Sequence, residues 1–128
     1  MTRISLVTPC FNEEDAIPVF LARVVPIMEA TGLDFEMLFV DDGSRDKTVA
    51  VLAEFSNQYK QIRVVELSRN FGKEAAMTAG LTYASGDAII PMDCDLLGLG
   101  HLRLVPRFDP SGGKDRNDQG TVTLQISG

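Results

Sequence analysis

The sequence predicts an α/β fold, a mostly parallel sheet with helices on both faces. Two observations support this fold class. Short runs of apolar, β-forming residues alternate along the chain with segments in which apolar residues recur at helical spacing. The predicted strands are apolar along nearly their whole length, as strands are when both faces of a parallel sheet are covered. A chain of 128 residues can form one such domain around one core.

The alternation begins with a strand at Ile4–Thr8, which ends in a proline and a polar turn. A helix is expected from Pro18, because apolar residues from Phe20 to Met28 recur at helical spacing. Pro18 suits the first turn, which tolerates a residue without an N–H. Pro26 predicts a kink or an early end of that helix. Ser44 or Asp46 is expected to cap a second helix. The other predicted elements are strands at Phe35–Val40, Ile62–Leu67 and Ala88–Met92, a helix that carries Val49, Leu52 and Phe55, and a helix at Glu74–Ala84.

The pattern changes after residue 96. Segment 97–100 has no clear period, and Pro106–Gly120 has the Gly-, Asp-, Asn-, Ser- and Pro-rich composition typical of loops or disorder. Thr121–Ile126 alternates enough for a weak strand. We therefore expect residues 1–96 to form the folded binding part and residues 97–128 to form a divergent, loop-rich or disordered tail.

Composition limits the classes of function. A net charge of −6 argues against a nucleic-acid partner, since phosphate polymers need a basic surface. No stretch approaches the roughly 20 apolar residues that span a bilayer. Cys10 and Cys94 lack metal-ligand spacing and are expected to be free thiols in a reducing cytoplasm. The single His101 is expected to be incidental.

Polar residues gather where the predicted strands end. Right-handed crossovers bring the carboxyl ends of parallel strands to one edge of the sheet. Ligands of open α/β sheets bind at that edge. The sequence therefore predicts one site built from four segments, which are 9–14, 41–44, 68–73 and 93–95.

Asp93 and Asp95 are the sharpest chemical signal among these segments. Two carboxylates two residues apart can approach one hard cation where the chain turns. Mg²⁺ or Mn²⁺ held there would neutralise a diphosphate leaving group. An isolated pair of this kind is more often two solvated turn aspartates. Its position after an apolar strand, at the ligand-binding edge, favours the metal site.

Three other segments each allow two interpretations. The Asp41–Ser44 turn is either a plain connection, the leading interpretation when it is taken alone, or the source of a carboxylate that accepts a ligand N–H. Arg69 and Lys73 precede a helix, where they either cradle a diphosphate together with free backbone N–H groups or remain solvated loop cations. Segment 9–14 supplies either helix caps or one wall of a nucleotide site.

Taken together, the four segments resemble the family 2 glycosyltransferases, whose GT-A fold is Rossmann-like, in order and spacing. The third segment resembles the branch that glycosylates polyprenyl phosphates, which includes dolichyl-phosphate mannose synthases and bactoprenol glucosyltransferases. The resemblance covers about residues 3–96. The matching segments are Val-Thr-Pro-Cys-Phe-Asn-Glu-Glu, Val-Asp-Asp-Gly-Ser-Arg-Asp-Lys-Thr, Ser-Arg-Asn-Phe-Gly-Lys-Glu-Ala-Ala and Gly-Asp-Ala-Ile-Ile-Pro-Met-Asp-Cys-Asp-Leu.

The resemblance implies an inverting transferase that moves a sugar from a nucleotide-sugar donor, of the UDP-glucose or GDP-mannose type, to a lipid phosphate at the cytoplasmic face of a membrane. In that family the acceptor phosphate attacks the anomeric carbon, and Mg²⁺ or Mn²⁺ offsets charge on the departing nucleotide. The resemblance assigns the nucleoside pocket to Pro9, Phe11, Asn12 and Glu13, the base contact to Asp42 with Asp41 beside it, the diphosphate to Arg69 and Lys73, and the metal and nucleotide sugar to Asp93 and Asp95.

The match to the family fails past Leu96. The polyprenyl branch usually has a glutamine that helps hold the metal, and this chain has Leu97 there. We expect a frameshift, a truncated reading frame or an engineered fragment that lacks the acceptor half. Transfer activity is then expected to be impaired, and the catalytic residues are unknown.

Two consequences of that loss are expected. An uncovered apolar surface predicts a marginally stable domain or a homodimer. The alternative function is a non-catalytic nucleotide- or metal-binding fragment that needs a partner chain. A phospho-accepting receiver domain is set aside, because the acidic pairs here follow the second and fourth strands.

Overall fold

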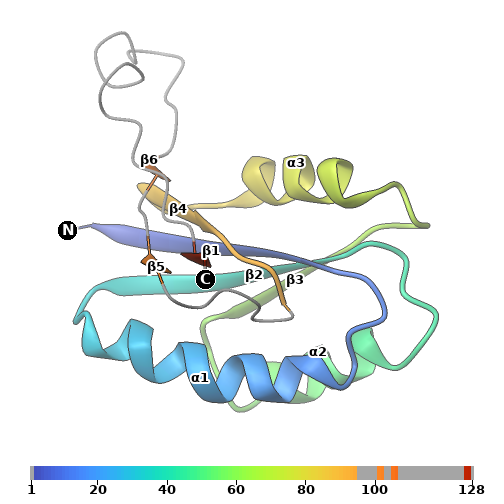
Figure 1. Cartoon of the computed structure of the whole chain (residues 1–128), viewed down its shortest axis with the longest axis horizontal. Helices are drawn as coiled ribbons and strands as arrows, with labels where there is room; N and C mark the ends of the chain where they lie inside the picture. The colour runs from blue at the N-terminus through green and yellow to red at the C-terminus, as the bar shows by residue number, and fades with distance from the viewer. Residues whose placement is uncertain (1, 95–100, 103–104, 107–125, 128) are drawn as a thin grey trace, which may run out of the picture.

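The computed structural model describes residues 2–94, 101–102, 105–106 and 126–127. A five-stranded sheet in the order β3-β2-β1-β4-β6 forms the centre of the molecule, and β5 and β7 pair separately (Figure 1). Strands β1 to β4 are parallel, and β6 pairs with β4 in the antiparallel sense. The strands are β1 Arg3–Cys10, β2 Asp34–Asp41, β3 Ile62–Glu66, β4 Ala88–Pro91, β5 His101–Leu102, β6 Val105–Pro106 and β7 Ile126–Ser127.

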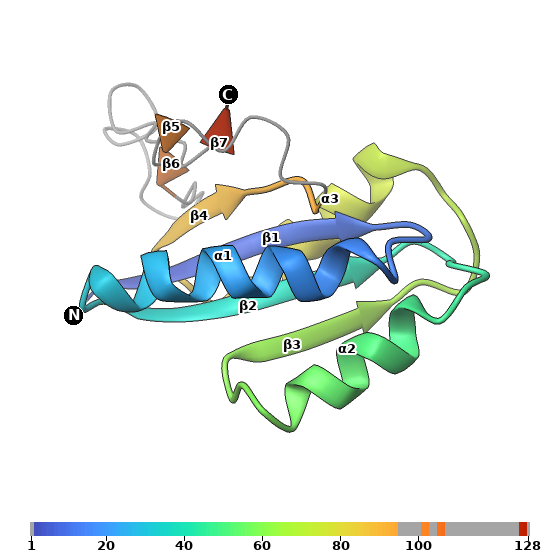
Figure 2. The ribbon, with the colours of Figure 1, turned by 60° about the horizontal axis from the view of Figure 1, so that its bottom comes forward.

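Helices cover both faces of this sheet, as predicted. Helices α1 (Ala16–Ala30) and α2 (Thr48–Ser56) lie on one face, and α3 (Lys73–Tyr83) lies on the other (Figures 1 and 2). The larger core lies between α1, α2 and the sheet, where the fully buried Phe20 and Phe39 meet edge to face at 5.8 Å. The α/β class and the helices on both faces are therefore confirmed.

Helix α3 approaches the sheet closely because Gly80 has no side chain. A Cβ at this position would lie 2.3 Å from the Val7 side chain on β1. The smaller core beneath the helix contains Val7, Leu38, Ala84 and Ile89. This close packing fixes α3, and with it the segment that leads into its first turn.

The early end predicted for the first helix at Pro26 is wrong, because α1 continues to Ala30. Pro26 is exposed, and so is Ala22, whose carbonyl loses its helical partner to the proline and can turn to water. Val24, Val25 and Met28 are buried in the core and hold the last turns against the sheet. Packing therefore outweighs the single lost hydrogen bond.

The second strand is longer than its apolar run. Asp41, which the sequence places in a turn, pairs with Cys10 as the last residue of β2. A parallel ladder is formed by backbone groups of the two strands, so it can continue through a polar residue such as Asp41. The N-cap of α2 is Lys47, which makes no side-chain cap hydrogen bond, so neither Ser44 nor Asp46 occupies the predicted cap position. Asp46, one residue earlier, accepts a hydrogen bond from the backbone N–H of Thr48 at 2.9 Å. The hydroxyl of Ser44 instead accepts the N–H of Asn12.

Buried Glu36 closes the amino-terminal end of the sheet. Its carboxylate accepts hydrogen bonds from the Ser5 hydroxyl at 2.5 Å, the Ser85 N–H at 2.7 Å and the Arg63 guanidinium at 2.7 Å. Burial by itself would raise the pKa of this carboxyl, but these donors outweigh it and lower the pKa to about 2. Glu36 is therefore an ionised group that links β1, β2, β3 and the end of α3.

Most of the predicted tail lies outside the described residues, so the expectations for residues 97–128 are not addressed by the structure. Of the weak strand predicted at Thr121–Ile126, Ile126 is the one residue that the structure describes, and it belongs to β7. Among the residues that the structure describes, no helix is long and apolar enough to cross a bilayer.

Candidate functional site

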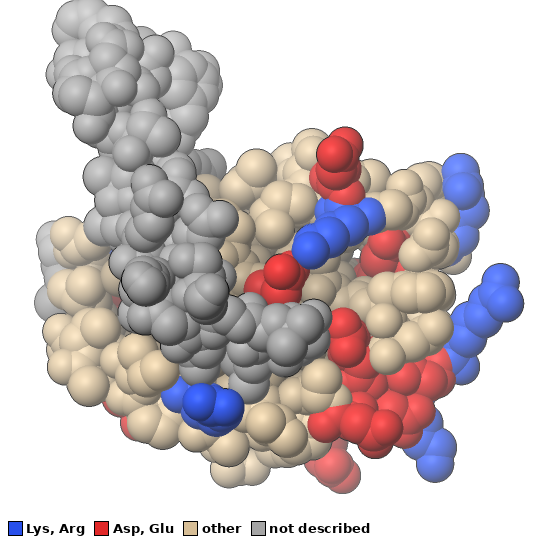
Figure 3. Space-filling model, viewed as in Figure 1, with Lys and Arg blue, Asp and Glu red and all other residues tan. Residues whose placement is uncertain are grey.

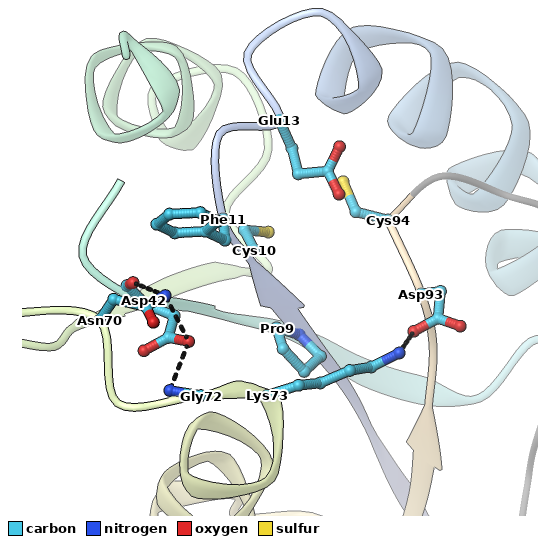
Figure 4. A pocket seen from close by; sticks show the side chains of 10 residues that line it. All are labelled: Pro9, Cys10, Phe11, Glu13, Asp42, Asn70, Gly72, Lys73, Asp93 and Cys94. Carbon is cyan, nitrogen blue, oxygen red and sulfur yellow. Dashed lines mark hydrogen bonds and ion pairs between the residues drawn. The ribbon is translucent and has the colours of Figure 1, made fainter. Parts of the chain in front are cut away.

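A cavity of about 360 Å³ lies at the carboxyl-terminal edge of the sheet, within the range of about 300–1,000 Å³ usual for small-molecule sites. Its walls come from the ends of β1, β2 and β4 and from the segment that leads into α3 (Figure 4). All four predicted segments contribute, so their convergence is confirmed. The lining residues are Pro9, Cys10, Phe11, Glu13, Asp42, Asn70, Gly72, Lys73, Asp93 and Cys94.

A second hollow of about 570 Å³ adjoins the first and shares Phe11 and Asn70 with it. The predicted residues Asp41 and Arg69 line this second hollow. Phe11 is 42% exposed, so its ring presents a face to both spaces. The residues predicted to bind the nucleotide sugar are thus divided between two neighbouring hollows, and Phe11 lines both.

Acidic side chains surround this edge. Figure 3 shows Asp and Glu gathered at the end of the molecule where β1 and β2 terminate, with Lys and Arg side chains standing at the rim. An acidic surface of this kind would repel a bare diphosphate, so an anionic ligand needs cations supplied within the site.

Asp42 fastens the loop that precedes α3. Its carboxylate accepts hydrogen bonds from the Asn70 side-chain amide at 3.1 Å, the Phe71 N–H at 2.7 Å and the Gly72 N–H at 3.0 Å. A carboxylate can accept about four hydrogen bonds, so one acceptor position remains for a ligand N–H. The structure thus gives Asp42 an internal role that the sequence analysis missed, and the predicted base contact stays a prediction.

Gly43 allows the same loop to pack against the turn after β2. Its φ of +74° lies in the left-handed region, and a Cβ there would be 2.4 Å from the backbone of Arg69 and Asn70. Asp42 and Gly43 therefore act together, one through hydrogen bonds and the other through close contact. The strand-to-helix turn and the loop before α3 form a single unit.

Asn12 joins two loops and does not line either of these hollows. Its backbone N–H donates to the Ser44 hydroxyl at 2.8 Å, and its side-chain oxygen accepts the N–H of Arg45 at 2.8 Å. Asn12 has a φ of +54°, a conformation that asparagine tolerates better than most residues. Its predicted place in the nucleoside pocket stays a prediction.

Asp41 has one buried oxygen without a partner in the described part of the chain. Its Oδ2 accepts the Ser44 N–H at 3.1 Å, whereas Oδ1 has no hydrogen-bond partner, and the residue is 1% exposed. An unsatisfied buried acceptor costs free energy, so a ligand donor that reached it would bind favourably.

Cys94 anchors the segment that follows β4. Its side chain is buried in the core, whereas the neighbouring Asp93 carboxylate is half exposed and lines the cavity. A hydrogen bond with the Cys94 thiol, together with burial, raises the pKa of the Cys10 thiol well above its usual range. Both cysteines are free, as predicted, and the raised pKa keeps the Cys10 thiol protonated at neutral pH. Asp95 lies outside the described residues.

Lys73 reaches across the cavity from the first turn of α3 to Asp93. Its ammonium lies 2.6 Å from the Asp93 Oδ1, as the dashed line in Figure 4 shows. Arg69 does not enter this cavity, because its guanidinium stacks over the Phe71 ring at 4.0 Å from the centroid. The two predicted diphosphate cations are therefore separated.

The described residues contain no group of three or more His, Cys, Asp or Glu side chains arranged to hold a metal ion. Mg²⁺ is usually bound by one or two carboxylates together with substrate phosphates, so such a group is not required. Asp93 supplies one hard oxygen ligand on the cavity wall, which fits that mode of binding.

Comparison with protein families decides the class of this chain. The model of "Glycosyl transferase family 2" matches residues 5–98. The chain belongs to glycosyl transferase family 2. The match covers all four segments that form the cavity edge, so the family resemblance inferred from those motifs is confirmed.

Curated relatives share this part of the family 2 chain. It is 46% identical over 94 residues to the bactoprenol glucosyl transferase of Shigella phage SfV, covering 73% of this chain and 31% of that protein. It is 44% identical over 93 residues to an uncharacterized glycosyltransferase of Synechocystis sp., covering 73% of this chain and 29% of that protein. The chain thus spans about 30% of the length of these relatives.

Solved structures agree with the fold. A mannosyltransferase from Pyrobaculum calidifontis, in complex with GDP-Man and Mn²⁺, matches with a TM-score of 0.63 and 23% identity, over 73% of this chain and 28% of that one. TarS of S. aureus in complex with UDP-GlcNAc matches with a TM-score of 0.59 and 27% identity, over 73% of this chain and 26% of that one. These likenesses confirm a GT-A-like arrangement.

Four lining residues were not predicted as site residues, namely Cys10, Asn70, Gly72 and Cys94. Each lies inside one of the four segments, so a signal was present. The local sequence could not show which side chains would enter the cavity, because their neighbours there come from other segments.

Proposed function

We propose that this chain binds a nucleotide-sugar donor in the cavity, as the donor-binding part of an inverting glycosyltransferase that acts on a polyprenyl phosphate. The observation that carries the proposal is the meeting of Asp42, Lys73 and Asp93 in one cavity of a family 2 chain. The UDP-GlcNAc complex of TarS, a relative in fold at 27% identity, supports a donor of this class.

Each part of a donor has a matching group on the cavity wall. The ring of Phe11 offers a stacking surface for a base. Asp42 on the cavity wall and Asp41 in the adjoining hollow offer carboxylate oxygens to its N–H groups. Lys73 and the backbone N–H groups at the start of α3 offer positive charge to a diphosphate.

Asp93, with Asp95, would hold Mg²⁺ or Mn²⁺. The ion, when bound, neutralises charge on the departing nucleoside diphosphate. The contact of Asp93 with Lys73, at the start of α3, supports a position of its carboxylate near the diphosphate. The donor-binding part would then end near residue 96, close to the end of the family match at residue 98.

The acceptor assignment rests on relatives. A bactoprenol glucosyl transferase covers 73% of this chain, and bactoprenol is a polyprenyl lipid, so a lipid phosphate at a membrane surface is the proposed acceptor. No described residue is assigned as catalytic, since the chain spans 31% of that relative.

Ligand-dependent thermal stability tests the proposal. The chain is melted with UDP-glucose, GDP-mannose, UDP and GDP, each with Mn²⁺ and each with EDTA. A donor that binds the folded chain raises Tm in proportion to the logarithm of its concentration over Kd. We expect a Mn²⁺-dependent shift with one base only. The absence of a shift with every nucleotide would refute a functional donor site in this chain.

A non-catalytic binding fragment that needs a partner chain is the second candidate. It is favoured by Leu97, an aliphatic residue where the polyprenyl branch usually has a metal-supporting glutamine. Donor binding without transfer to a polyprenyl phosphate would support this function, and transfer by this chain alone would exclude it. Light scattering in the same samples tests the expected homodimer.

A further inference from the structure

The ion pair between Lys73 and Asp93 spans the cavity that the proposed donor would enter. Lys73 is the first residue of α3, and Asp93 follows β4, so the contact links opposite walls (Figure 4). The two charged groups are 2.6 Å apart, and their side chains are 67% and 54% exposed. Both groups are therefore accessible to incoming ions.

Helix geometry does not explain a lysine at this position. The amino-terminal end of a helix carries a partial positive charge, which disfavours a cation in the first turn. Glu74, the acidic residue of the same turn, offsets part of this cost. The Lys73 ammonium nevertheless pairs with Asp93 on the opposite wall of the cavity, so its charge acts on the cavity.

The anionic partner of Lys73 is also the candidate metal ligand. The ammonium occupies Oδ1 of Asp93, and a divalent cation would use the same carboxylate. The two cations repel each other and compete for one anion, so both cannot hold it at full strength. The flexible four-carbon stem of lysine allows the ammonium to move to another anion nearby.

We infer that Lys73 is a movable counter-ion, which holds Asp93 in the free chain and transfers to the donor diphosphate when a divalent cation takes Asp93. This inference rests on the proposed donor function and goes beyond it, because it assigns cooperativity between metal and nucleotide to one side chain. The metal releases Lys73 for the diphosphate, and the diphosphate draws Lys73 away from the metal ligand. Linkage requires that each ligand tightens the other by the same factor.

Lys73→Met tests the inference, because methionine keeps the length of the side chain without its charge. Mn²⁺ binding without nucleotide is measured by electron paramagnetic resonance, and UDP and GDP binding by calorimetry with and without Mn²⁺. Loss of the competing cation should tighten Mn²⁺ binding alone by about two- to fivefold, the range of an exposed ion pair. Loss of the diphosphate contact should weaken binding of the nucleotide with Mn²⁺ by about tenfold or more.

The decisive quantity is the factor by which Mn²⁺ tightens nucleotide binding. Direct contact between Mn²⁺ and the phosphates supplies one part of this factor, and release of Lys73 supplies the rest. Lys73→Met should remove the second part and leave a smaller factor. Lys73→Arg keeps the positive charge and should restore much of the factor. The matched control is Lys60→Met, an exposed lysine between α2 and β3 that does not line the cavity and should leave every constant unchanged.

The outcomes separate this inference from the proposed function. If the parent chain binds nucleotide with Mn²⁺ but Lys73→Met binds Mn²⁺ alone no more tightly and keeps the full coupling factor, the counter-ion role is wrong and the donor site stands. If the parent binds no nucleotide, the proposed function fails and this inference fails with it. Equal melting temperatures of parent and variant would show that the fold is intact.

Discussion

The two ends of the sheet differ in how exposed their carboxylates are and in how many protein donors bind them. At the amino-terminal end, Glu36 is 1% exposed, and donors from three other segments occupy both of its oxygens. At the carboxyl-terminal end, the Asp93 side chain is 54% exposed and pairs with Lys73, whose side chain is 67% exposed. The first carboxylate is committed to the fold, and the second can change its partner.

Asp42 lies between these extremes. It is buried and accepts three hydrogen bonds like Glu36, yet it lines the cavity like Asp93. Asp42 therefore combines both roles, because its three protein donors hold the loop before α3 while its position on the cavity wall leaves it available to a ligand. Substitutions at the two ends should therefore differ in their effects on stability and on binding.

The largest effect on stability is expected for Gly43→Ala. The new Cβ would enter the backbone of the loop before α3 and the residue would keep a left-handed φ, which together should cost about 2–5 kcal/mol of the free energy of unfolding. Gly32→Ala is the matched control, since Gly32 has a φ of +71° with nothing within 4 Å, and it should cost about 1–2 kcal/mol. Denaturant unfolding measures both, and equal losses would contradict a tightly packed loop.

The second-largest effect is expected for Glu36→Gln, which should lower the free energy of unfolding by about 2–3 kcal/mol. The buried donors around Glu36 would then face a neutral amide instead of a charged carboxylate. The pKa of Glu36 is about 2 in the folded chain and near 4.5, the ordinary value for glutamate, when the chain is unfolded. Its contribution is therefore present above the unfolded pKa and is lost as the pH falls from about 4.5 toward 2.

The pH profile checks that contribution. The free energy of unfolding of the parent should fall over this acid range, and the fall in Glu36→Gln should be shallower. Parallel pH profiles of the two proteins would show that Glu36 does not titrate as the structure indicates.

Asp42→Asn should cost about 1–2 kcal/mol, since an amide N–H₂ would face one of the backbone donors of the loop. It should also weaken nucleotide binding. Asn70→Ala removes one hydrogen bond to the same carboxylate and leaves the carboxylate in place. Calorimetry distinguishes the two roles: if both variants bind nucleotide weakly, Asp42 acts through the loop, and if only Asp42→Asn does, it contacts the base.

Asp93→Asn should change the free energy of unfolding least, by under about 1 kcal/mol, because exposed ion pairs contribute little. Its effect should appear in ligand binding, where Mn²⁺ no longer raises nucleotide affinity and EDTA makes no further difference. A variant that keeps its Mn²⁺ dependence would remove Asp93 from the metal site. A large loss of stability would instead place Asp93 in the same class as Glu36.

The sequence by itself determined the strand and helix order, the parallel sheet and the edge at which the polar segments meet. These follow from local periodicity and from the handedness of crossovers, which need no knowledge of side-chain partners. It also determined the family, because four ordered motifs lie inside the matched residues. The early end of the helix at Pro26 was wrong, since a local rule took no account of the packing that continues α1 past it.

Only the tertiary structure decided what each acidic residue holds. Asp42 meets donors 28 to 30 residues away, and Glu36 meets Ser85 at a separation of 49 residues. The partners of Lys73 and Cys10 likewise lie on the segment after β4. Such partners depend on which strands are neighbours in the sheet and on how closely α3 approaches it. A local sequence pattern specifies neither the order of the strands in the sheet nor the distance between α3 and the sheet.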